Sequence, residues 1–460
     1  MRGGVSEWTQ QLINELHFLD FDIFCLSPTG QESWISEYEK PRNVKSVTIH
    51  GVIIQPNSSR QKPLFLSEAI AQELRNCMGA VLEGRAIGYE TLAQLIGSSA
   101  SDTKAWLTSK QHWDYLVQFY QRQSPDVDFS QFFWTANGIF ASLMDTIALV
   151  KKLPKADIYH SLTTGLGGFL GCLGKVQYQR PLVISEHGLY LKERLLDLAK
   201  QDISPAVKQQ ITNYYQSLVM TCYECADLIV PVCQDHADRE VELGVDPKKI
   251  RVVINGVDPD KFTPNITTNG HKPIVGCIAR IVPIKDQVTL IRASKNILEE
   301  HDVDFIFAGE IQDEEYYREC QALVKHLDLS EKIKFIGHSD NMLDLYRKAD
   351  IFVLSSRSEG VPLALLEAMS CGLPSVCTAV GGVPEILPDT ITGFLVPPGD
   401  IDCLASKIST LLDDPELRKK MGIRARELIK EKYTVGEMAQ KILGIYNEMF
   451  AKETKVNGSS

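Results

Sequence analysis

The chain has 460 residues, of which 44% are hydrophobic and 23% charged, and its formal net charge is -11 at pH 7. The length exceeds one ordinary hydrophobic core and predicts two or three domains of globular composition. The acidic charge argues against a nucleic-acid binder and against a polybasic membrane anchor, so an anionic ligand must be held by local cationic groups. The opening residues MRGGVSEWTQQL have no apolar signal core, and we expect no run long enough to cross a bilayer.

The first predicted element is a helix at residues 6–16, which follows the glycine turn Gly3-Gly4. Such a turn opens a doubly wound domain, where a strand precedes it, yet only Met1 and Arg2 stand before it here. Two interpretations are open: the sequence starts late, or the first domain lacks a central strand. A missing strand should leave its neighbours in the sheet exposed.

Short apolar runs alternate with helical patterns along most of the chain, which predicts parallel sheets covered on both faces. The polar stretch 263–271 divides the runs into two sets and is the expected interdomain linker. The first set comprises 22–27, 47–54, 158–161, 182–185, 228–232 and 250–254, and the second 273–279, 304–309, 333–337, 351–355 and 375–378. The fold class is therefore α/β, with two doubly wound, Rossmann-like domains that face a crevice at the carboxyl ends of their strands.

Residues 64–153 lack strand signals and carry amphipathic helix patterns, which indicates a helical insertion in the first domain. We interpret the insertion as scaffold. An alternative is that the aromatic cluster at 129–134 lines a surface that binds an acceptor or a partner.

A histidine follows a predicted strand in the first domain, where Glu186-His187-Gly188 comes directly after PLVIS. This position places His187 at the crevice, where an imidazole can bond a sugar hydroxyl or a phosphate; a structural histidine is the equally weighted alternative. The glycine-rich run 165–174 misses the spacing of a dinucleotide fingerprint and favours a close helix–strand packing turn.

The 11 cysteines form no framework and suit buried thiols in a reducing cytosol. Cys222, Cys225, Cys233 and His236 have a spacing that a zinc site could use, although buried thiols are the preferred interpretation. Of the D-x-D pairs, the first and last lie at strand starts, the wrong end for a site, and Asp258/Asp260 has no third ligand beside it, so we expect no essential divalent metal.

Two cations follow the first strand of the second domain. Arg280 and Lys285 lie in the loop before a helix predicted at 286–298. At the carboxyl end of a strand they make a phosphate clamp, with solvated loop cations as the alternative.

Residues 351–371 predict a strand, a polar turn and a helix. The turn holds Glu359, Gly360 and Val361, with Pro362 as the first helical residue and Glu367 further along the helix. A helix N-terminus offers free N–H groups for a diphosphate, and carboxylates accept strong hydrogen bonds from sugar and ribose hydroxyls. The alternative is a capping Glu359 with a solvated Glu367.

Two more polar residues follow strands of the second domain. Glu310 comes after Gly309, and His338 comes after Gly337, where it could contact a nucleobase. Both positions fall on the ligand-binding edge of a doubly wound sheet.

Together these residues resemble the family-4 retaining glycosyltransferases of GT-B architecture, over nearly the whole chain and most specifically over 273–399. The motifs that carry the resemblance are E-x7-E (Glu359, Glu367), R-x4-K (Arg280, Lys285), the N-G-V-D turn at 255–258 and the N-terminal Gly3-Gly4. RGGVSEW, EHGLYLKER and the helical insertion resemble the subgroup that builds Pel-type exopolysaccharide.

The resemblance implies a cytoplasmic hexosyltransferase, peripheral at the inner face of the membrane, with a membrane-bound polysaccharide synthase and no nucleic acid as partner. UDP-glucose would be the donor and a growing glycan the acceptor, with no metal cofactor. The domains would be 1–265, 266–434, and a C-terminal segment 435–460 that crosses back to the first domain.

The resemblance also implies residue roles. Gly3, Gly4 and His187 would contact phosphate or sugar from the first domain. Arg280 and Lys285 would neutralise the leaving UDP, while Glu359 would bind donor-sugar hydroxyls and Glu367 the ribose. Two other activities stay open on this architecture, a sugar-nucleotide 2-epimerase and a non-catalytic sugar-nucleotide binder.

Overall fold

The computed structural model describes residues 4–27, 40–52, 67–97, 106–123, 128–264, 271–339 and 341–457. The chain divides into two compact units. Unit 1 comprises Met1–Pro231, Glu240–Arg251 and Leu443–Ser460, and unit 2 comprises Val232–Arg239 and Val252–Ile442. The first expected site residue, Gly3, lies outside the described residues.

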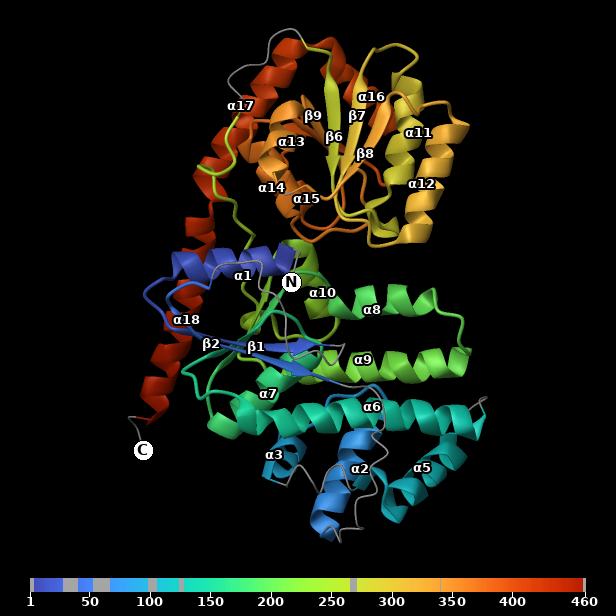
Figure 1. Ribbon diagram of the computed structural model, residues 1–460. Helices are drawn as coiled ribbons and strands as arrows, with labels where there is room; N and C mark the ends of the chain where they lie inside the picture. Colours follow the sequence, from blue (N-terminus) through green and yellow to red (C-terminus); the bar gives the residue numbers. More distant parts are fainter. Residues whose placement is uncertain are drawn as a thin grey trace. The chain divides into compact units, whose positions relative to one another are not determined.

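Unit 2 is built on a parallel sheet that is six-stranded in the described residues, with the order β11-β10-β9-β6-β7-β8 (Figure 1). The strands are β6 (Ile274–Ile278), β7 (Asp304–Ala308), β8 (Ile333–Gly337), β9 (Ile351–Leu354), β10 (Ser375–Thr378) and β11 (Gly393–Val396). The chain winds outward from β6 to β8 and then returns to the other side of β6 with β9. The order of the strands therefore reverses between β6 and β9, which are paired neighbours.

Helices cover both faces of this sheet (Figure 1). They are α11 (Gln287–Ile297), α12 (Glu314–His326), α13 (Met342–Lys348), α14 (Leu363–Ser370), α15 (Val383–Ile386), α16 (Ile401–Asp413) and α17 (Pro415–Lys432), with the 3-10 turn η3 (Pro283–Lys285) before α11. Side chains of β9 alternate between two cores: Phe352 and Leu354 pack with α13 to α15, and Ile351 and Val353 pack with α11, α12 and α16. This alternation explains why the strand reads as a continuous apolar run.

Unit 1 holds its described strands in two separate parallel sheets. One pairs β1 (Phe21–Ser27) with β2 (Val44–Gly51), and the other has the order β3-β4-β5, from β3 (Tyr159–Ser161), β4 (Leu182–Glu186) and β5 (Leu228–Pro231). Every residue of β4 and β5 is buried, whereas most of β1 is only half-buried. Within the described residues no strand joins β1 to β3, and the partial exposure of β1 is what such a gap predicts.

The rest of unit 1 is helical. Its helices are α1 (Gly4–Glu15), α2 (Glu68–Leu82), α3 (Tyr89–Gly97), α5 (Lys110–Gln123), α6 (Phe129–Leu149), α7 (Leu166–Tyr178), α8 (Tyr190–Ala199) and α9 (Pro205–Cys225), and η1 (Val150–Lys152) extends α6. Helix α10 (Gln234–Glu242) begins in unit 2 and ends in unit 1, η2 (Pro247–Lys249) follows it in unit 1, and α18 (Val435–Asn457) begins in unit 2 and ends in unit 1. The predicted helical insertion is confirmed, because the described part of 64–153 is helical as far as Lys152.

The expectation that no run reaches membrane-spanning length was wrong. Residues Phe129–Lys152 are long and apolar enough by composition, but 61% of the most apolar window is buried inside the protein. Most apolar residues of α6 belong to the core of unit 1, and the helix packs on α9 (Figure 1). The apolar character of this helix is therefore explained by burial in protein.

Three local predictions need correction. Residues 250–254 form no strand, and Ile250 makes only an isolated bridge to Ile229. The sequence pattern missed β11, a short edge strand. Gly4 is the first residue of α1 rather than part of a turn before it.

Candidate functional site

The candidate site of unit 2 lies where β6 and β9 end side by side. The loop after β6 carries Arg280 and Lys285, and the loop after β9 carries Glu359. Because the direction of winding reverses between these strands, their two following loops diverge and leave a ligand-sized opening in doubly wound folds. The sheet order thus brings the predicted R-x4-K and E-x7-E motifs to one edge.

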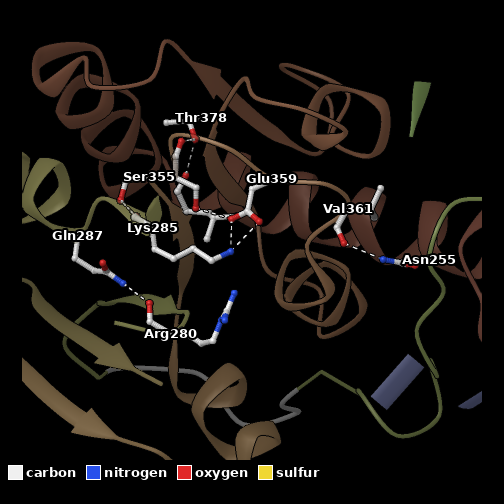
Figure 2. A network of polar contacts seen from close by, with 10 residues as sticks. Asn255, Arg280, Lys285, Gln287, Ser355, Glu359, Val361 and Thr378 are labelled. Carbon is white, nitrogen blue, oxygen red and sulfur yellow. Dashed lines mark hydrogen bonds and ion pairs between the residues drawn. The ribbon is translucent and has the colours of Figure 1, made fainter. Parts of the chain in front are cut away.

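Lys285 and Glu359 form an ion pair (Figure 2). The Lys285 ammonium donates to both carboxylate oxygens, with Nζ 2.6 Å from Oε1 and 2.8 Å from Oε2. The side chains are only 14% and 7% exposed, so the charges compensate each other in a partly dry environment. Two residues to which the sequence assigned separate tasks are therefore one unit.

The pair has limited capacity for a ligand. Ser356 Oγ donates to Glu359 Oε1 at 2.5 Å, so the carboxylate accepts three hydrogen bonds out of about four that it can take. Lys285 uses two of its three N–H donors. One acceptor position on Glu359 and one donor position on Lys285 remain, which suits a hydroxyl beside an anionic oxygen.

The loops under the pair are tied to each other. Ser355 Oγ donates to the backbone oxygen of Asp286 at 2.9 Å, and Thr378 Oγ1 donates to that of Ser356 at 2.6 Å (Figure 2). Asp286 takes a left-handed conformation with φ 46°, and its buried carboxylate accepts from Thr289 and from Arg357. These contacts fix the positions of the loops on which Lys285 and Glu359 stand.

A glycine turn after β10 packs directly on the turn that holds Glu359. Gly381 has φ 52°, and a Cβ there would lie 1.8 Å from the carbonyl oxygen of Glu359. The N–H of Gly382 donates to the oxygen of Gly360 at 3.0 Å. A side chain at residue 381 would therefore displace the turn.

Helix α14 follows Glu359 and carries Glu367. Pro362 is the N-cap of this helix rather than its first residue, a shift of one position from the prediction. Glu367 is 8% exposed and its Oε2 accepts from the hydroxyl of Tyr346 at 2.6 Å, so it is not the solvated glutamate of the alternative interpretation. The carbonyl of Val361 accepts from Asn255 at 3.0 Å, which ties the turn to the N-G-V-D segment (Figure 2).

Arg280, Glu310 and His338 are exposed at the ends of β6, β7 and β8. Arg280 donates to Gln312 Oε1 at 2.9 Å, and Gln312 donates to Glu310 Oε2 at 2.9 Å, so Gln312 links the two charged residues. Gln287 donates to the backbone oxygen of Arg280 at 2.9 Å (Figure 2). Arg280 is therefore the exposed cation of the predicted clamp.

His187 follows β4 in unit 1. Its ring lies edge-on to Trp8 of α1, with centroids 4.6 Å apart. Trp8 is also edge-on to His160, whose two ring nitrogens lie 2.7 Å from Ser185 Oγ and 2.6 Å from Tyr446 Oη. Burial, with a smaller effect of His187, lowers the pKa of His160 to about 3, so this histidine is neutral. The described member of the expected glycine pair, Gly4, begins the helix that bears Trp8.

The glycine-rich run of unit 1 is a packing element, as its spacing indicated. Helix α7 begins at Leu166, and a Cβ on Gly171 would lie 2.8 Å from Leu182 of β4. The zinc interpretation gains no support: in the described part of the chain no group of three or more His, Cys, Asp or Glu side chains could hold a metal ion.

Sequence reasoning missed residues that support the site. Ser356, Tyr346 and Asn255 bond the predicted motifs, yet each is an ordinary polar residue in its own segment. Ser356 alone carried a usable signal, because it lies two residues after the end of β9.

In this parallel sheet the strand order reverses between β6 and β9, and charged loops follow both strands. This arrangement is typical of α/β proteins that bind nucleotides. Residues 1–248 match the family described as Domain of unknown function (DUF3492), and residues 259–428 match Glycosyl transferases group 1. The chain belongs to the DUF3492 family, whose model covers over half of it, and its residues 259–428 are similar to the group 1 glycosyltransferases.

Curated relatives agree with this membership. N-acetyl-alpha-D-glucosaminyl L-malate synthase of Bacillus anthracis is 29% identical over 51% of this chain, which spans 62% of that enzyme's length. UDP-Gal:alpha-D-GlcNAc-diphosphoundecaprenol alpha-1,3-galactosyltransferase of Escherichia coli is 27% identical over 67% of this chain and 79% of its own length.

Solved structures establish the fold. Sucrose-phosphate synthase from Thermosynechococcus elongatus matches with a TM-score of 0.64 at 18% identity, over 98% of this chain and 94% of that one. Anabaena HepE in complex with UDP and glucose matches with a TM-score of 0.57 at 21% identity, over 66% of this chain and 80% of its own. The protein has the two-domain, Rossmann-like GT-B fold that the sequence predicted.

Proposed function

We propose that this protein is a retaining glycosyltransferase that moves a hexosyl group from UDP-glucose to a growing glycan in exopolysaccharide biosynthesis. The observation that carries the proposal is the Lys285–Glu359 pair at the switch point of the unit 2 sheet. It presents one acceptor for a sugar hydroxyl beside one donor for a phosphate oxygen.

The donor assignment rests on chemistry and on relatives. Arg280 supplies an exposed guanidinium for a diphosphate in a chain of net charge -11, and the free N–H groups at the start of α14 add to the positive potential. The structure of HepE is a complex with UDP and glucose, and the Escherichia coli relative is named for UDP-Gal as its donor. We extend UDP-hexose to this chain on that basis, with Glu367 as the ribose acceptor and Glu310, His338, Gly360, Val361 and Pro362 around the nucleotide.

The reaction we propose needs little covalent participation by the protein. The bond from the anomeric carbon to the phosphate oxygen breaks, and the acceptor hydroxyl oxygen bonds to that carbon on the same face. The acceptor proton passes to the departing phosphate oxygen, and UDP leaves. Arg280 and Lys285 stabilise the charge that develops on UDP, while Glu359 positions the donor sugar.

For unit 1 we propose the roles that the resemblance implies, in which His187, Gly3 and Gly4 contact the donor sugar or phosphate. The ring of His187 is oriented by Trp8, which gives an imidazole of fixed direction. The charge compensation on UDP is assigned to the two cations rather than to a metal ion, so activity should survive EDTA. We further propose a cytoplasmic protein at the inner face of the membrane that hands its glycan to a membrane-bound polysaccharide synthase.

Incubation with UDP-glucose, UDP-galactose and UDP-N-acetylglucosamine, with release of UDP as the readout, tests the proposal. We expect release above the spontaneous rate with UDP-glucose, enhanced by acceptor glycans. Calorimetric binding of UDP without release would favour the non-catalytic binder, and conversion of UDP-N-acetylglucosamine to its 2-epimer would favour the epimerase. Glu367→Ala should weaken UDP-glucose binding, and unchanged affinity would sink the ribose assignment.

A further inference from the structure

Two glutamates that the proposed reaction does not use are buried together in unit 1. Glu186 is the last residue of β4 and is 1% exposed, and Glu240, near the end of α10, is 0% exposed. Their carboxyl groups are within hydrogen-bond reach of each other. Two carboxylates cannot both stay ionised at this distance in a dry site without a compensating cation.

Glu186 already has donors on most of its acceptor positions. Thr164 Oγ1 donates to Oε1 at 2.9 Å, the Tyr190 N–H donates to the same oxygen at 3.4 Å, and Tyr223 Oη donates to Oε2 at 2.7 Å. These three bonds use about three of four acceptor positions, as expected for an ionised carboxylate. One position is left.

Glu240 has the opposite environment. Neither of its carboxyl oxygens receives a hydrogen bond from any donor in the described part of the chain. A buried carboxylate without donors is unstable, whereas a carboxylic acid can donate its own proton to the remaining position on Glu186. The two environments are therefore complementary.

We propose that Glu186 and Glu240 share one proton, which Glu240 donates to Glu186, and that the pair acts as a positioning device for the carboxyl end of β4. The bond ties α10 to the strand from which His187 directly follows. On the other side of that strand end, Ser185 Oγ lies 2.7 Å from His160. The link to His187 rests on the proposed function, but the shared proton does not.

The groups around Glu186 and Glu240 favour a proton between the two carboxyl groups rather than a cation. Burial raises the pKa of Glu186, and burial and the charge of Glu186 both raise that of Glu240. The other titratable group in contact is Tyr223 of α9, whose own pKa is raised by burial and by the glutamates, and Cys222 of α9 lies beside Tyr223. Tyr190 of α8 contributes only its N–H to Glu186. No cation is among the main contributors to either glutamate's pKa in the residues that the structure describes.

The shared proton predicts a pH dependence with a definite sign. A folded-state pKa above the unfolded value means that the folded protein holds one more proton than the unfolded chain. The stabilisation is complete below about pH 4.3 and is lost as pH rises toward the folded pKa. Between the unfolded and the folded pKa, the equilibrium constant for unfolding rises about tenfold per pH unit, because unfolding releases the proton.

Glu240→Gln is the central test, because an amide N–H can replace the donated proton but cannot ionise. In urea unfolding from pH 6 to 9, the ratio of the wild-type to the Glu240→Gln unfolding constant should grow about tenfold per pH unit. Glu242→Gln changes an exposed residue of the same helix, so its unfolding constant should have the same pH dependence as that of the wild type. Parallel pH profiles for wild type and Glu240→Gln would overturn the proposal.

Glu186→Gln supplies a second measurement. If the two glutamates share one proton, replacing either of them with glutamine removes that same proton. Glu186→Gln, Glu240→Gln and the double variant should each lose the same one-proton dependence; a two-proton loss in the double variant would exclude sharing. If the variants do not fold, infrared spectra of the wild type decide: the carbonyl stretch of a protonated carboxylic acid should persist at pH 7.5, and its absence would overturn the proposal.

The positioning role is tested separately, by enzyme kinetics. If glycosyl transfer is observed, kcat should decline at alkaline pH in the wild type and in Glu242→Gln, and the decline should move to higher pH in Glu240→Gln. If kcat declines at the same alkaline pH in all three proteins, the glutamate pair does not position His187 for the reaction. If no transfer is detected, the proposed function fails while the unfolding and infrared results still decide whether the proton is shared.

Discussion

Lys285 Nζ lies 2.6 and 2.8 Å from the two carboxylate oxygens of Glu359, although 74 residues separate them in the chain. Each follows a central strand of the unit 2 sheet, and the pair is almost closed to solvent. The arrangement means that replacing either residue leaves the charge of the other without its partner.

Replacing Lys285 with Met should therefore cost stability as well as activity. The change leaves Glu359 with Ser356 as its remaining side-chain donor, and loss of one partner of a buried pair costs about 3 kcal/mol or more in unfolding free energy. UDP release should fall on the order of a hundredfold. Urea unfolding and initial rates measure both effects, with Lys295→Met on the exposed side of α11 as the control. Wild-type stability in Lys285→Met would show that the pair contributes nothing to the fold.

Gly381→Ala should disrupt the turn that carries Glu359. The added methyl would meet the Glu359 carbonyl and would also occupy a left-handed conformation. We expect a loss of about 2–5 kcal/mol in unfolding free energy, from a left-handed cost of about 1–2 and an overpacking cost of about 1–3 kcal/mol.

Gly399→Ala is the matched control for this change. Gly399 has φ 77° but open space where the Cβ would be, so only the conformational cost applies. Equal destabilisation of the two variants, measured by chemical unfolding, would contradict the close approach to Glu359.

Tyr346→Phe isolates the hydrogen bond to Glu367. The hydroxyl is buried and donates at 2.6 Å, so its removal should lower the unfolding free energy by about 1.5–3 kcal/mol, the range for a bond to a charged group. Affinity for UDP should fall as well, because Glu367 loses its fixed orientation. Calorimetry gives both numbers. Tyr317→Phe, whose hydroxyl only accepts from Gln321 at the surface, should change neither.

His160 should contribute to acid unfolding. Burial lowers the pKa of this histidine to about 3, below the unfolded value near 6.5, so the unfolded chain binds one more proton between these pH values. Stability from this residue is present above about pH 6.5 and is lost as pH falls toward 3, by up to about 1.4 kcal/mol per pH unit. His160→Gln should reduce the slope of unfolding free energy against pH by about one proton between pH 4 and 6. The exposed His326→Gln should retain the wild-type slope, and a retained slope in His160→Gln would refute the assignment.

Local sequence signals were enough for most strands of the three described sheets. Each buried strand of unit 2 is an apolar run bounded by polar or glycine residues, so its end and the residue after it can be read without the fold. The loops that carry Arg280, Lys285 and Glu359 were located in this way, and Glu367 was located from the helix that follows.

The failures have a common cause. Residues 250–254 are as apolar as a strand, but only Ile250 finds a strand partner, in a bridge to Ile229. The edge strand β11 pairs with β10 alone and has only four residues, too few for a clear pattern. Pairing, which decides both cases, is a property of the neighbouring segment and not of the run itself.

Periodicity and adjacent residues were sufficient to predict the α/β class, the helical insertion and the charged residues at strand ends. The folded structure was needed to show that Lys285 pairs with Glu359, that Tyr346 bonds Glu367, and that Glu186 lies beside Glu240. Those contacts join segments that are distant in the chain and depend on strand order, helix docking and burial, which no local pattern records.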